Sequence, residues 1–351
     1  MESLDQRLVS SWFHGHSSVP PTYVQPLESR PGCRFMSPSC MSIPVIDLGD
    51  RHNDRADTIK HILKASEQYG FFQVINHRVS KDLVEETLNV FKEFRAMPPK
   101  EKVNECSKDP IGRCKMYTSS ENYEKDAIKY WKDSLTHPCP PSGEYMQYWP
   151  DKPTKYREVV GKYTQEMRKL GHEILELLSE GLGLDPSYFH GKLSKNPQVL
   201  QHHYPPCPEP SLTLGIAKHR DTSIITILLQ EQDVQGLQVL KDGEWLRVDP
   251  IPNAFVVNIG LLLQVISNGR LVGAEHRVVT NSTMARTSVA YFIYPSLKTI
   301  IEPAQCLLNN GTTLPMYKSM PFGEFRTSFL AKFPKFEEEL RFKWKNVNDA
   351  R

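Results

Sequence analysis

This chain of 351 residues lacks long apolar runs, a strong charge imbalance and closely spaced cysteines. No stretch reaches the roughly 20 apolar residues that cross a bilayer as a helix. Glu2, Asp5 and Arg7 precede the first apolar segment, which is unlike the basic-then-apolar order of a signal peptide. The 43 basic and 41 acidic residues are well mixed and leave a formal net charge of +2. We therefore expect neither membrane insertion nor nucleic-acid binding.

The seven cysteines form no Cys-x-x-Cys pair and stand at positions 33, 40, 106, 114, 139, 207 and 306. A disulfide framework or a zinc knuckle would be denser and more regular. We expect reduced thiols in a cytoplasmic, monomeric protein. A hydrophobic content of 39% and a charged content of 24% are typical of a globular chain. The length suffices for one large domain or two closely joined ones.

The first half of the chain is predicted to hold an arm and a mainly helical region. Residues 1–42 are rich in proline and serine, and we expect an extended arm that is draped on the surface or partly disordered. Residues 43–195 should be mainly helical, with strands at about 43–48 and 71–76 and helices at about 55–70, 80–97 and 155–181. Within them, residues 104–152 are irregular and rich in aromatics, which is typical of a long functional loop.

The second half of the chain changes to strand-like periods. Residues 196–300 hold short apolar segments that are too close together for intervening helices, at 224–229, 237–240, 244–248, 254–259, 275–280 and 287–294. Lys241-Asp242-Gly243 predicts a tight hairpin turn, because glycine tolerates a positive φ. We expect an antiparallel barrel or sandwich of jelly-roll type. Residues 301–351 form a tail that returns to helical spacing from Pro321 on.

Two pairs of residues and a lone histidine in the strand region suggest the chemistry. His219 and Asp221 are two positions apart, His276 follows, and Arg286 is two positions from Ser288. Alternate side chains of a strand share a face, so each pair is predicted to point one way. Two histidines and one carboxylate can occupy one face of a ferrous ion and leave three positions open.

An anionic chelating co-ligand would suit such a ferrous site, because the three ligands leave a residual positive charge. An α-keto acid offers a carboxylate and a keto oxygen, and its far carboxylate then needs a cation. Arg286 supplies a planar fork for that carboxylate, and Ser288 supplies a hydroxyl beside it. The last position is left for dioxygen, so oxidative decarboxylation of the keto acid would create an oxidant for a nearby C–H bond.

Other interpretations of these residues remain open. A His-x-Asp pair occurs by chance in many proteins, His276 alone is more often an ordinary histidine, and Arg286 with Ser288 is more often a solvated strand edge. Their order within consecutive strands favours a site. A zinc hydrolase could use the same three ligands with a water molecule. That alternative gives Arg286 no role, and no carboxylate is placed to act as its general base.

The two pairs and His276 together resemble the signature of the plant Fe(II)/2-oxoglutarate-dependent dioxygenases. Residues 204–208 (Tyr-Pro-Pro-Cys-Pro), 70–77 and 43–48 are similar to that family too, and the resemblance spans residues 43 to 335. It implies an α+β fold in which N-terminal helices brace a double-stranded β-helix (jelly-roll) core, followed by a C-terminal helical tail. It also implies Fe(II), 2-oxoglutarate and O2, ascorbate as reductant, and a contact between Tyr204 and 2-oxoglutarate.

Within the family the chain resembles hyoscyamine 6β-hydroxylase and its relatives. The matching stretches are residues 130–135, 149–153, 155–160 and 258–261. A shared scaffold inherited from a common ancestor explains this similarity as well as a shared substrate does.

Three positions depart from the family pattern. His202-His203 stands where Asn-Tyr is common, Arg78 replaces a glycine, and Thr118-Ser119-Ser120 contains no acidic residue. His202 is expected near the co-substrate, where it retunes the site, replaces a hydrogen bond or adds a fourth iron ligand. The missing acidic residue argues against a cationic alkaloid as substrate.

Aromatic and apolar side chains are the candidates for the substrate pocket. Phe292 and Tyr294 share the strand face of Arg286 and Ser288 and are expected to line it. Further candidates are Tyr117 in the aromatic loop, Leu200 at the entrance to the strand region, and Phe322 and Phe325 in the tail, where they are predicted to act as a lid. Core packing is the alternative for each of them.

The sequence thus predicts a non-haem Fe(II)- and 2-oxoglutarate-dependent dioxygenase. It is expected to hydroxylate a small, largely apolar plant metabolite, an alkaloid such as a tropane or a phenolic, with release of succinate and CO2. Epoxidation, desaturation and dealkylation would use the same oxidant. Two rivals are an oxidase of the same fold that uses no 2-oxoglutarate and a non-catalytic small-molecule binding protein.

Overall fold

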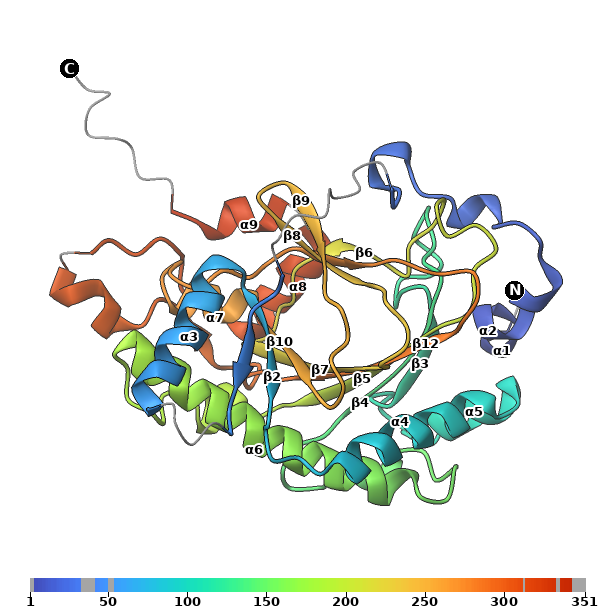
Figure 1. The fold of residues 1–351 in the computed structure, drawn as a ribbon, viewed down its shortest axis with the longest axis horizontal. Coiled ribbons are helices and arrows are strands. Elements are labelled where there is room, and N and C mark those ends of the chain that lie inside the picture. Colours follow the sequence, from blue (N-terminus) through green and yellow to red (C-terminus); the bar gives the residue numbers. More distant parts are fainter. Residues whose placement is uncertain (1–2, 33–41, 50–53, 312, 333–334, 343–351) are drawn as a thin grey trace.

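Two β-sheets face each other, and helices cover the outside of the larger sheet (Figure 1). The computed structural model describes residues 3–32, 42–49, 54–311, 313–332 and 335–342. The larger sheet has the strand order β1-β2-β10-β7-β12-β5-β4-β3, and the smaller sheet has the order β6-β11-β8-β9. A third, two-stranded sheet pairs β13 with β14. The predicted α+β jelly-roll fold is confirmed.

The strands are short, as expected for this type of core. Their bounds are β1 Val45–Asp47, β2 Phe71–Ile75, β3 Lys115–Thr118, β4 Asp133–Pro138, β5 Gln198–Tyr204, β6 Ile216–His219, β7 Ile225–Gln230, β8 Leu237–Lys241, β9 Glu244–Arg247, β10 Phe255–Ile259, β11 His276–Val278, β12 Arg286–Phe292, β13 Ile300–Ile301 and β14 Met320–Pro321. Only β1 and β2 pair in parallel among these strands. Asp242 and Gly243 both have positive φ in the β8–β9 turn, as that hairpin requires.

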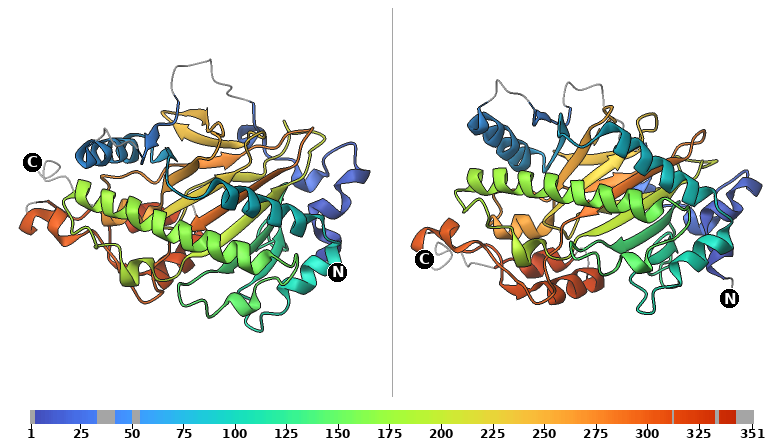
Figure 2. Two further views of the ribbon diagram at one scale, coloured as in Figure 1. Left: turned by 60° about the horizontal axis from the view of Figure 1, so that its bottom comes forward. Right: turned by 90° about the horizontal axis from the view of Figure 1, so that it is seen from below.

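The helices fall into an N-terminal group, a bracing group and a tail. Their bounds are α1 Leu4–Arg7, α2 Val9–Trp12, α3 Arg55–Gln68, α4 Lys81–Ala96, α5 Pro99–Cys106, α6 Tyr156–Leu182, α7 Leu261–Ile266, α8 Phe322–Lys332 and α9 Lys335–Leu340. The long α6 crosses the outer face of the larger sheet beside α4, as the two turned views show (Figure 2). None of the described helices is long and apolar enough to cross a membrane.

Side chains alternate along the strands, which gives the larger sheet an apolar outer face and a more polar inner face. The outward side chains of β7, such as Ile225 and Ile227, join α6 in one buried core. α6 approaches this face closely at Gly171, where a Cβ atom would lie 2.6 Å from Ile293 Cδ1. The inward side chains of the same sheet include Tyr204 and Arg286, which lie opposite each other on β5 and β12. The helices therefore fix one side of the sheet and leave the other side for chemistry.

The N-terminal arm is more ordered than the sequence predicts. Residues 3–32 contain α1, α2 and three 3-10 turns, so the expectation of a purely extended arm is wrong for this part. Val9 and Tyr23 are buried against Trp131. The Asp133 carboxylate accepts hydrogen bonds from the backbone N–H groups of Val9 and Ser10, both at 2.9 Å. Residues 33–41 lie outside the described part of the chain.

Residues 104–152 are also more regular than predicted. They contain the end of α5 and the strands β3 and β4, which pair with each other and extend the larger sheet from β5. The helix α7 was not predicted at all. The described cysteines are free, four of them buried and Cys306 exposed, as the expectation of reduced thiols requires. Cys33 and Cys40 lie outside the described residues.

Candidate metal and co-substrate site

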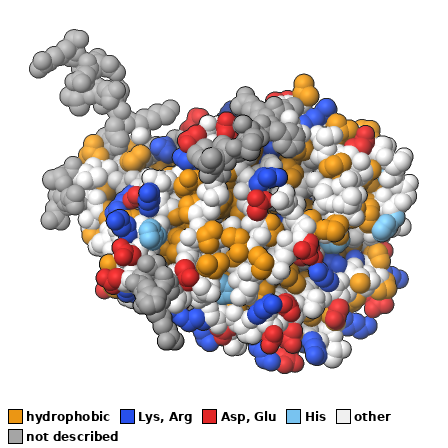
Figure 3. All heavy atoms as spheres, viewed as in Figure 1, with side chains coloured by type: hydrophobic (Ala, Val, Ile, Leu, Met, Phe, Trp, Pro, Cys, Tyr) orange, Lys and Arg blue, Asp and Glu red, His pale blue; other side chains and the backbone are white. Residues whose placement is uncertain are grey.

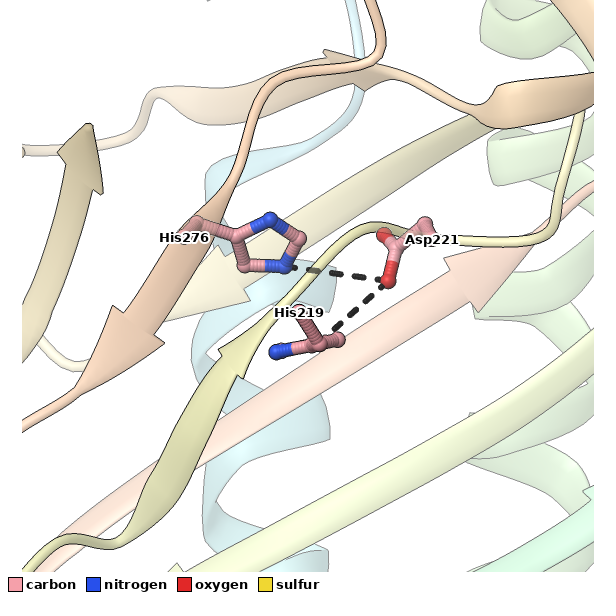
Figure 4. Close-up of side chains that lie close together, drawn as sticks. All are labelled: His219, Asp221 and His276. Atoms are coloured by element: carbon pink, nitrogen blue, oxygen red, sulfur yellow. Dashed lines mark ion pairs between the residues drawn. The ribbon is translucent and has the colours of Figure 1, made fainter. Parts of the chain in front are cut away.

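His219, Asp221 and His276 converge between the two sheets (Figure 4). His219 ends β6 and His276 begins β11, and the two residues are direct partners in the antiparallel register. Asp221 Oδ1 lies 3.6 Å from His219 Nε2 and 3.7 Å from His276 Nε2. The strand prediction for the His-x-Asp pair needs correction, because β6 stops at His219 and Asp221 stands in the loop after it.

Both histidine rings are oriented by hydrogen bonds on the side away from the cluster. His219 Nδ1 lies 2.9 Å from the carbonyl oxygen of Ala217, and His276 Nδ1 lies 3.2 Å from that of Ala274. A carbonyl oxygen only accepts, so each Nδ1 carries the proton and each Nε2 keeps a free lone pair toward Asp221. This tautomer is the one that a metal ligand needs.

Two partners from the larger sheet hold the Asp221 carboxylate. Its Oδ2 accepts hydrogen bonds from the Thr226 hydroxyl at 2.6 Å and from the Asn258 side-chain amide at 2.7 Å. These donors come from β7 and β10 and leave Oδ1 facing the two histidines. Sequence reasoning missed both residues. Asn258 belongs to a stretch that resembles relatives, and no spacing rule connects it to Asp221.

Electrostatics favour the metal-binding protonation state. Burial by itself would raise the pKa of Asp221, but His276, His219 and the Thr226 hydroxyl hold it well below its usual range. Burial, followed by the charge of His219, lowers the pKa of His276 to about 4. At neutral pH Asp221 is therefore a carboxylate and His276 a neutral imidazole. This donor set fits a divalent ion such as Fe(II).

Arg286 presents a buried positive charge to the same interior. It is 2% exposed, and its Nη2 donates to Gln230 Oε1 at 3.0 Å. Its Nε and Nη1, like the hydroxyl of Tyr204, form no hydrogen bond with any residue that the structure describes. The guanidinium lies 5.3 Å from the centre of the Tyr204 ring, and Ser288 is the next inward residue of β12. Because an unsatisfied buried cation is costly, this arrangement fits a dicarboxylate such as 2-oxoglutarate.

His202 lies beside this group on the inner face of β5, directly opposite Ser288. Its Nδ1 is 2.8 Å from the Ser134 hydroxyl, and its ring centre is 5.9 Å from that of Tyr204. Burial, followed by the charges of Lys132 and other cations, keeps the pKa of His202 well below its usual value. The cluster of metal-binding groups found among the described residues does not include His202.

Three of the predicted pocket aromatics form one stack. The rings of Phe292 and Tyr294 stack at 5.6 Å, and Tyr294 stacks on Phe322 at 5.7 Å. Burial, followed by the negative charge of Asp221, raises the pKa of Tyr294, which places the stack beside the cluster. Phe325 lies apart and is fully buried, with its ring 5.1 Å from that of Phe336.

The other two pocket candidates lie further along the larger sheet. Tyr117 is on β3 opposite Ser134, and Leu200 is on β5 opposite Ala290. Both positions belong to the inner face that carries His202.

Comparisons with known proteins agree with this geometry. Residues 195–295 match the 2OG-Fe(II) oxygenase superfamily, and residues 43–156 match the N-terminal region of non-haem dioxygenases in morphine synthesis. The chain is 41% identical to hyoscyamine 6-dioxygenase of Hyoscyamus niger, over 92% of this chain and 94% of the relative. It is 40% identical to protein DOWNY MILDEW RESISTANCE 6 of Arabidopsis thaliana, over 93% and 95% of the two chains.

A solved structure shows the same fold. The crystal structure of JOX2 in complex with 2OG, Fe and JA superposes with a TM-score of 0.80 at 33% identity, and the match covers 93% of each chain. The chain therefore belongs to the 2OG-Fe(II) oxygenase superfamily. More narrowly, it is a plant 2-oxoglutarate-dependent dioxygenase, an oxidoreductase with Fe(II) as cofactor and 2-oxoglutarate and O2 as co-substrates, for which ascorbate is the typical reductant.

Proposed function

We propose that His219, Asp221 and His276 hold Fe(II), and that Arg286 binds the far carboxylate of 2-oxoglutarate with help from Ser288 and Tyr204. The observation that carries this assignment is the buried guanidinium of Arg286, which keeps two nitrogens without a partner among the described residues and faces the same interior as the cluster. The enzyme then hydroxylates a small plant metabolite and releases succinate and CO2.

The side chains around the metal have distinct tasks in this proposal. Bound Fe(II), together with O2 and 2-oxoglutarate, supplies the oxidising power. Thr226 and Asn258 hold Asp221 in its ionised form and aim Oδ1 at the metal position. Arg286 fixes 2-oxoglutarate by charge and by its planar shape.

The substrate is an aromatic or polycyclic small molecule, either an alkaloid such as a tropane or a phenolic. The stack of Phe292, Tyr294 and Phe322 supports this class, because flat rings pack well on aromatic faces. The names of two relatives support one substrate class each, an alkaloid and a phenolic. One is hyoscyamine 6-dioxygenase, and the other is flavanone 3-dioxygenase 2 of Oryza sativa subsp. japonica, which is 36% identical over 90% of this chain and 92% of the relative. Epoxidation or dealkylation would follow from a different placement of the reacting C–H bond.

A screen of plant alkaloids and phenolics tests this function, with product mass and succinate read in the same reaction. We expect at least one compound to gain oxygen with one succinate formed per product. Product without succinate would instead support the rival oxidase, and failure to bind Fe(II) would support a non-catalytic binding protein. The free thiols of the described cysteines support a location in the cytoplasm. On the face drawn in Figure 3, charges of both signs lie mainly around a central area of hydrophobic side chains. Sedimentation of the purified chain tests the proposed monomer.

A further inference from the structure

Lys132 places a second positive charge on the inner wall of the larger sheet. The residue is only 6% exposed and directly precedes β4. Ser134 of that strand points inward, since its hydroxyl contacts His202, and alternation puts Lys132 on the same face. Its Nζ lies 5.3 Å from the centre of the Tyr117 ring, which is also an inner-face side chain.

Asp133, the acidic residue next to Lys132 in the sequence, acts on the pKa of Lys132 by its charge, but its carboxylate has other partners. Asp133 points to the opposite face of the sheet, as alternation requires. Its two carboxylate oxygens accept the backbone N–H groups of Val9 and Ser10, each at 2.9 Å. The carboxylate is thus used to anchor the N-terminal arm.

Two further acidic groups act on Lys132, and both have other partners. Glu121 forms an ion pair with Lys115, with 3.1 Å between Oε2 and Nζ. Asp126 accepts a hydrogen bond from the Ser120 hydroxyl. Within the described ranges, no residue forms a hydrogen bond or an ion pair with the Lys132 ammonium.

The surroundings of Lys132 on the inner face are neutral. Burial lowers the pKa of Lys132 to about 8, so the side chain is still mostly charged at neutral pH. Burial, followed by the charges of Lys132 and Arg95, keeps His202 neutral by holding its pKa well below its usual value. Burial raises the pKa of the Tyr117 phenol, which is therefore neutral as well. This wall carries a buried cation that an anion would stabilise.

We propose that Lys132 binds a carboxylate of the primary substrate, which makes this enzyme an oxygenase of small aromatic acids. The inference rests on the proposed function, because it names the substrate class of the same site. The strand β5 lies between β4 and β12, so Lys132 and Arg286 stand two strands apart. The two cations can therefore serve two different carboxylates, one on the substrate and one on 2-oxoglutarate.

Matched acids and amides test this proposal without turnover. The protein, loaded with Fe(II) and 2-oxoglutarate under argon, is titrated with benzoate, phenylacetate, cinnamate and 4-coumarate and with the four corresponding amides. Each pair has nearly the same shape and differs in charge. The variants are Lys132→Met, which keeps the length of the side chain without its charge, and Lys132→Arg, which keeps the charge.

We expect at least one acid to bind the wild type about tenfold or more tightly than its amide. Lys132→Met should abolish this preference, Lys132→Arg should retain most of it, and the affinity for 2-oxoglutarate should stay unchanged. Equal binding of acids and amides by the wild type overturns the proposal. So does a Lys132→Met protein that keeps the preference, or one that loses 2-oxoglutarate binding instead.

If Lys132→Met does not fold, the preference for acids over amides in the wild type and in Lys132→Arg decides whether the proposal holds. Failure of the proposed function can be told apart from failure of this inference. Succinate formation without any preference for acids overturns only the role of Lys132. Absence of succinate with every compound overturns the proposed function, while a charge preference that depends on Lys132 would still stand.

Discussion

The two oxygens of the Asp221 carboxylate have different tasks. Oδ2 is held by Thr226 and Asn258, and Oδ1 faces the two histidines. The convergence of His219, Asp221 and His276 could be predicted from the sequence because their residue types and order are distinctive. The residues that hold the Asp221 carboxylate could not be predicted. Asn258, for example, lies 37 positions from Asp221 and contacts it only because the sheet brings the two together.

Replacing Asn258 by alanine should weaken Fe(II) binding by about 10- to 100-fold, because the carboxylate loses one of its two orienting donors. Titration of the apoprotein with Fe(II) under argon measures the change. Asn104→Ala, at an exposed position of α5, is the matched control and should bind like the wild type. An Asn258→Ala protein with unchanged iron affinity would contradict the orienting role.

Lys132 shows a different limit of sequence reasoning. Residues 130–135 resemble relatives, and shared scaffold explains this resemblance equally well. The lysine of this stretch became informative only when the structure showed that Asp133 points away, while Glu121 and Asp126 have other partners. Which charges remain unpaired depends on the whole fold, and no local pattern contains this information.

At the scale of elements, the loop after β6 is positioned by the start of α7. The backbone N–H of Leu261 donates to the carbonyl oxygen of Asp221 at 2.7 Å, and that of Gly260 donates to Ile224 at 2.9 Å. A Cβ atom at position 260 would lie 1.9 Å from the carbonyl oxygen of Ser223. Glycine at this position therefore allows the loop to lie directly against the helix.

Gly260→Ala should displace the loop that carries Asp221. We expect a clear loss of Fe(II) affinity together with a lower melting temperature, measured by metal titration and by thermal unfolding. Gly15→Ala provides the control, because a Cβ atom there meets nothing within 4 Å. Normal iron binding and stability in Gly260→Ala would show that the close contact is unimportant.

The elements that were missed had no periodic signal. All six residues of α7 are buried, so the helix shows no polar face from which a helical period could be recognised. In β4, inward residues such as Ser134 and Thr136 are buried although they are polar, which hides the alternation of the strand. In contrast, α6 and the hairpin at Asp242 follow strong patterns and were predicted correctly.

At the scale of the whole molecule, the helix-covered face of the larger sheet buries neutral histidines. His137 packs between Trp149 and Tyr156, and its Nε2 lies 2.9 Å from the Tyr156 hydroxyl. Burial lowers the pKa of His137 to about 3 and that of His203 to about 3. Both values lie well below the ordinary 6.5 of an unfolded histidine.

The free energy of unfolding should therefore fall as the pH is lowered from about 6.5 toward 3. In this window the unfolded chain binds more protons than the folded one, and each such histidine contributes a loss of about 1.4 kcal/mol per pH unit. Urea unfolding at several pH values measures this slope. His137→Gln should reduce this slope by the contribution of one histidine, about 1.4 kcal/mol per pH unit. His61→Gln, on the exposed face of α3, should leave the slope unchanged. An equal slope in His137→Gln and wild type would refute the assignment.

We propose that iron-dependent oxidation coupled to 2-oxoglutarate depends on His219, Asp221 and His276. Succinate formation with added Fe(II), compared between the wild type and Asp221→Ala, tests it most directly. We predict succinate in step with oxidised product for the wild type, and none for an Asp221→Ala protein that still gives the circular dichroism spectrum of the folded chain. Undiminished succinate formation by Asp221→Ala would contradict the claim.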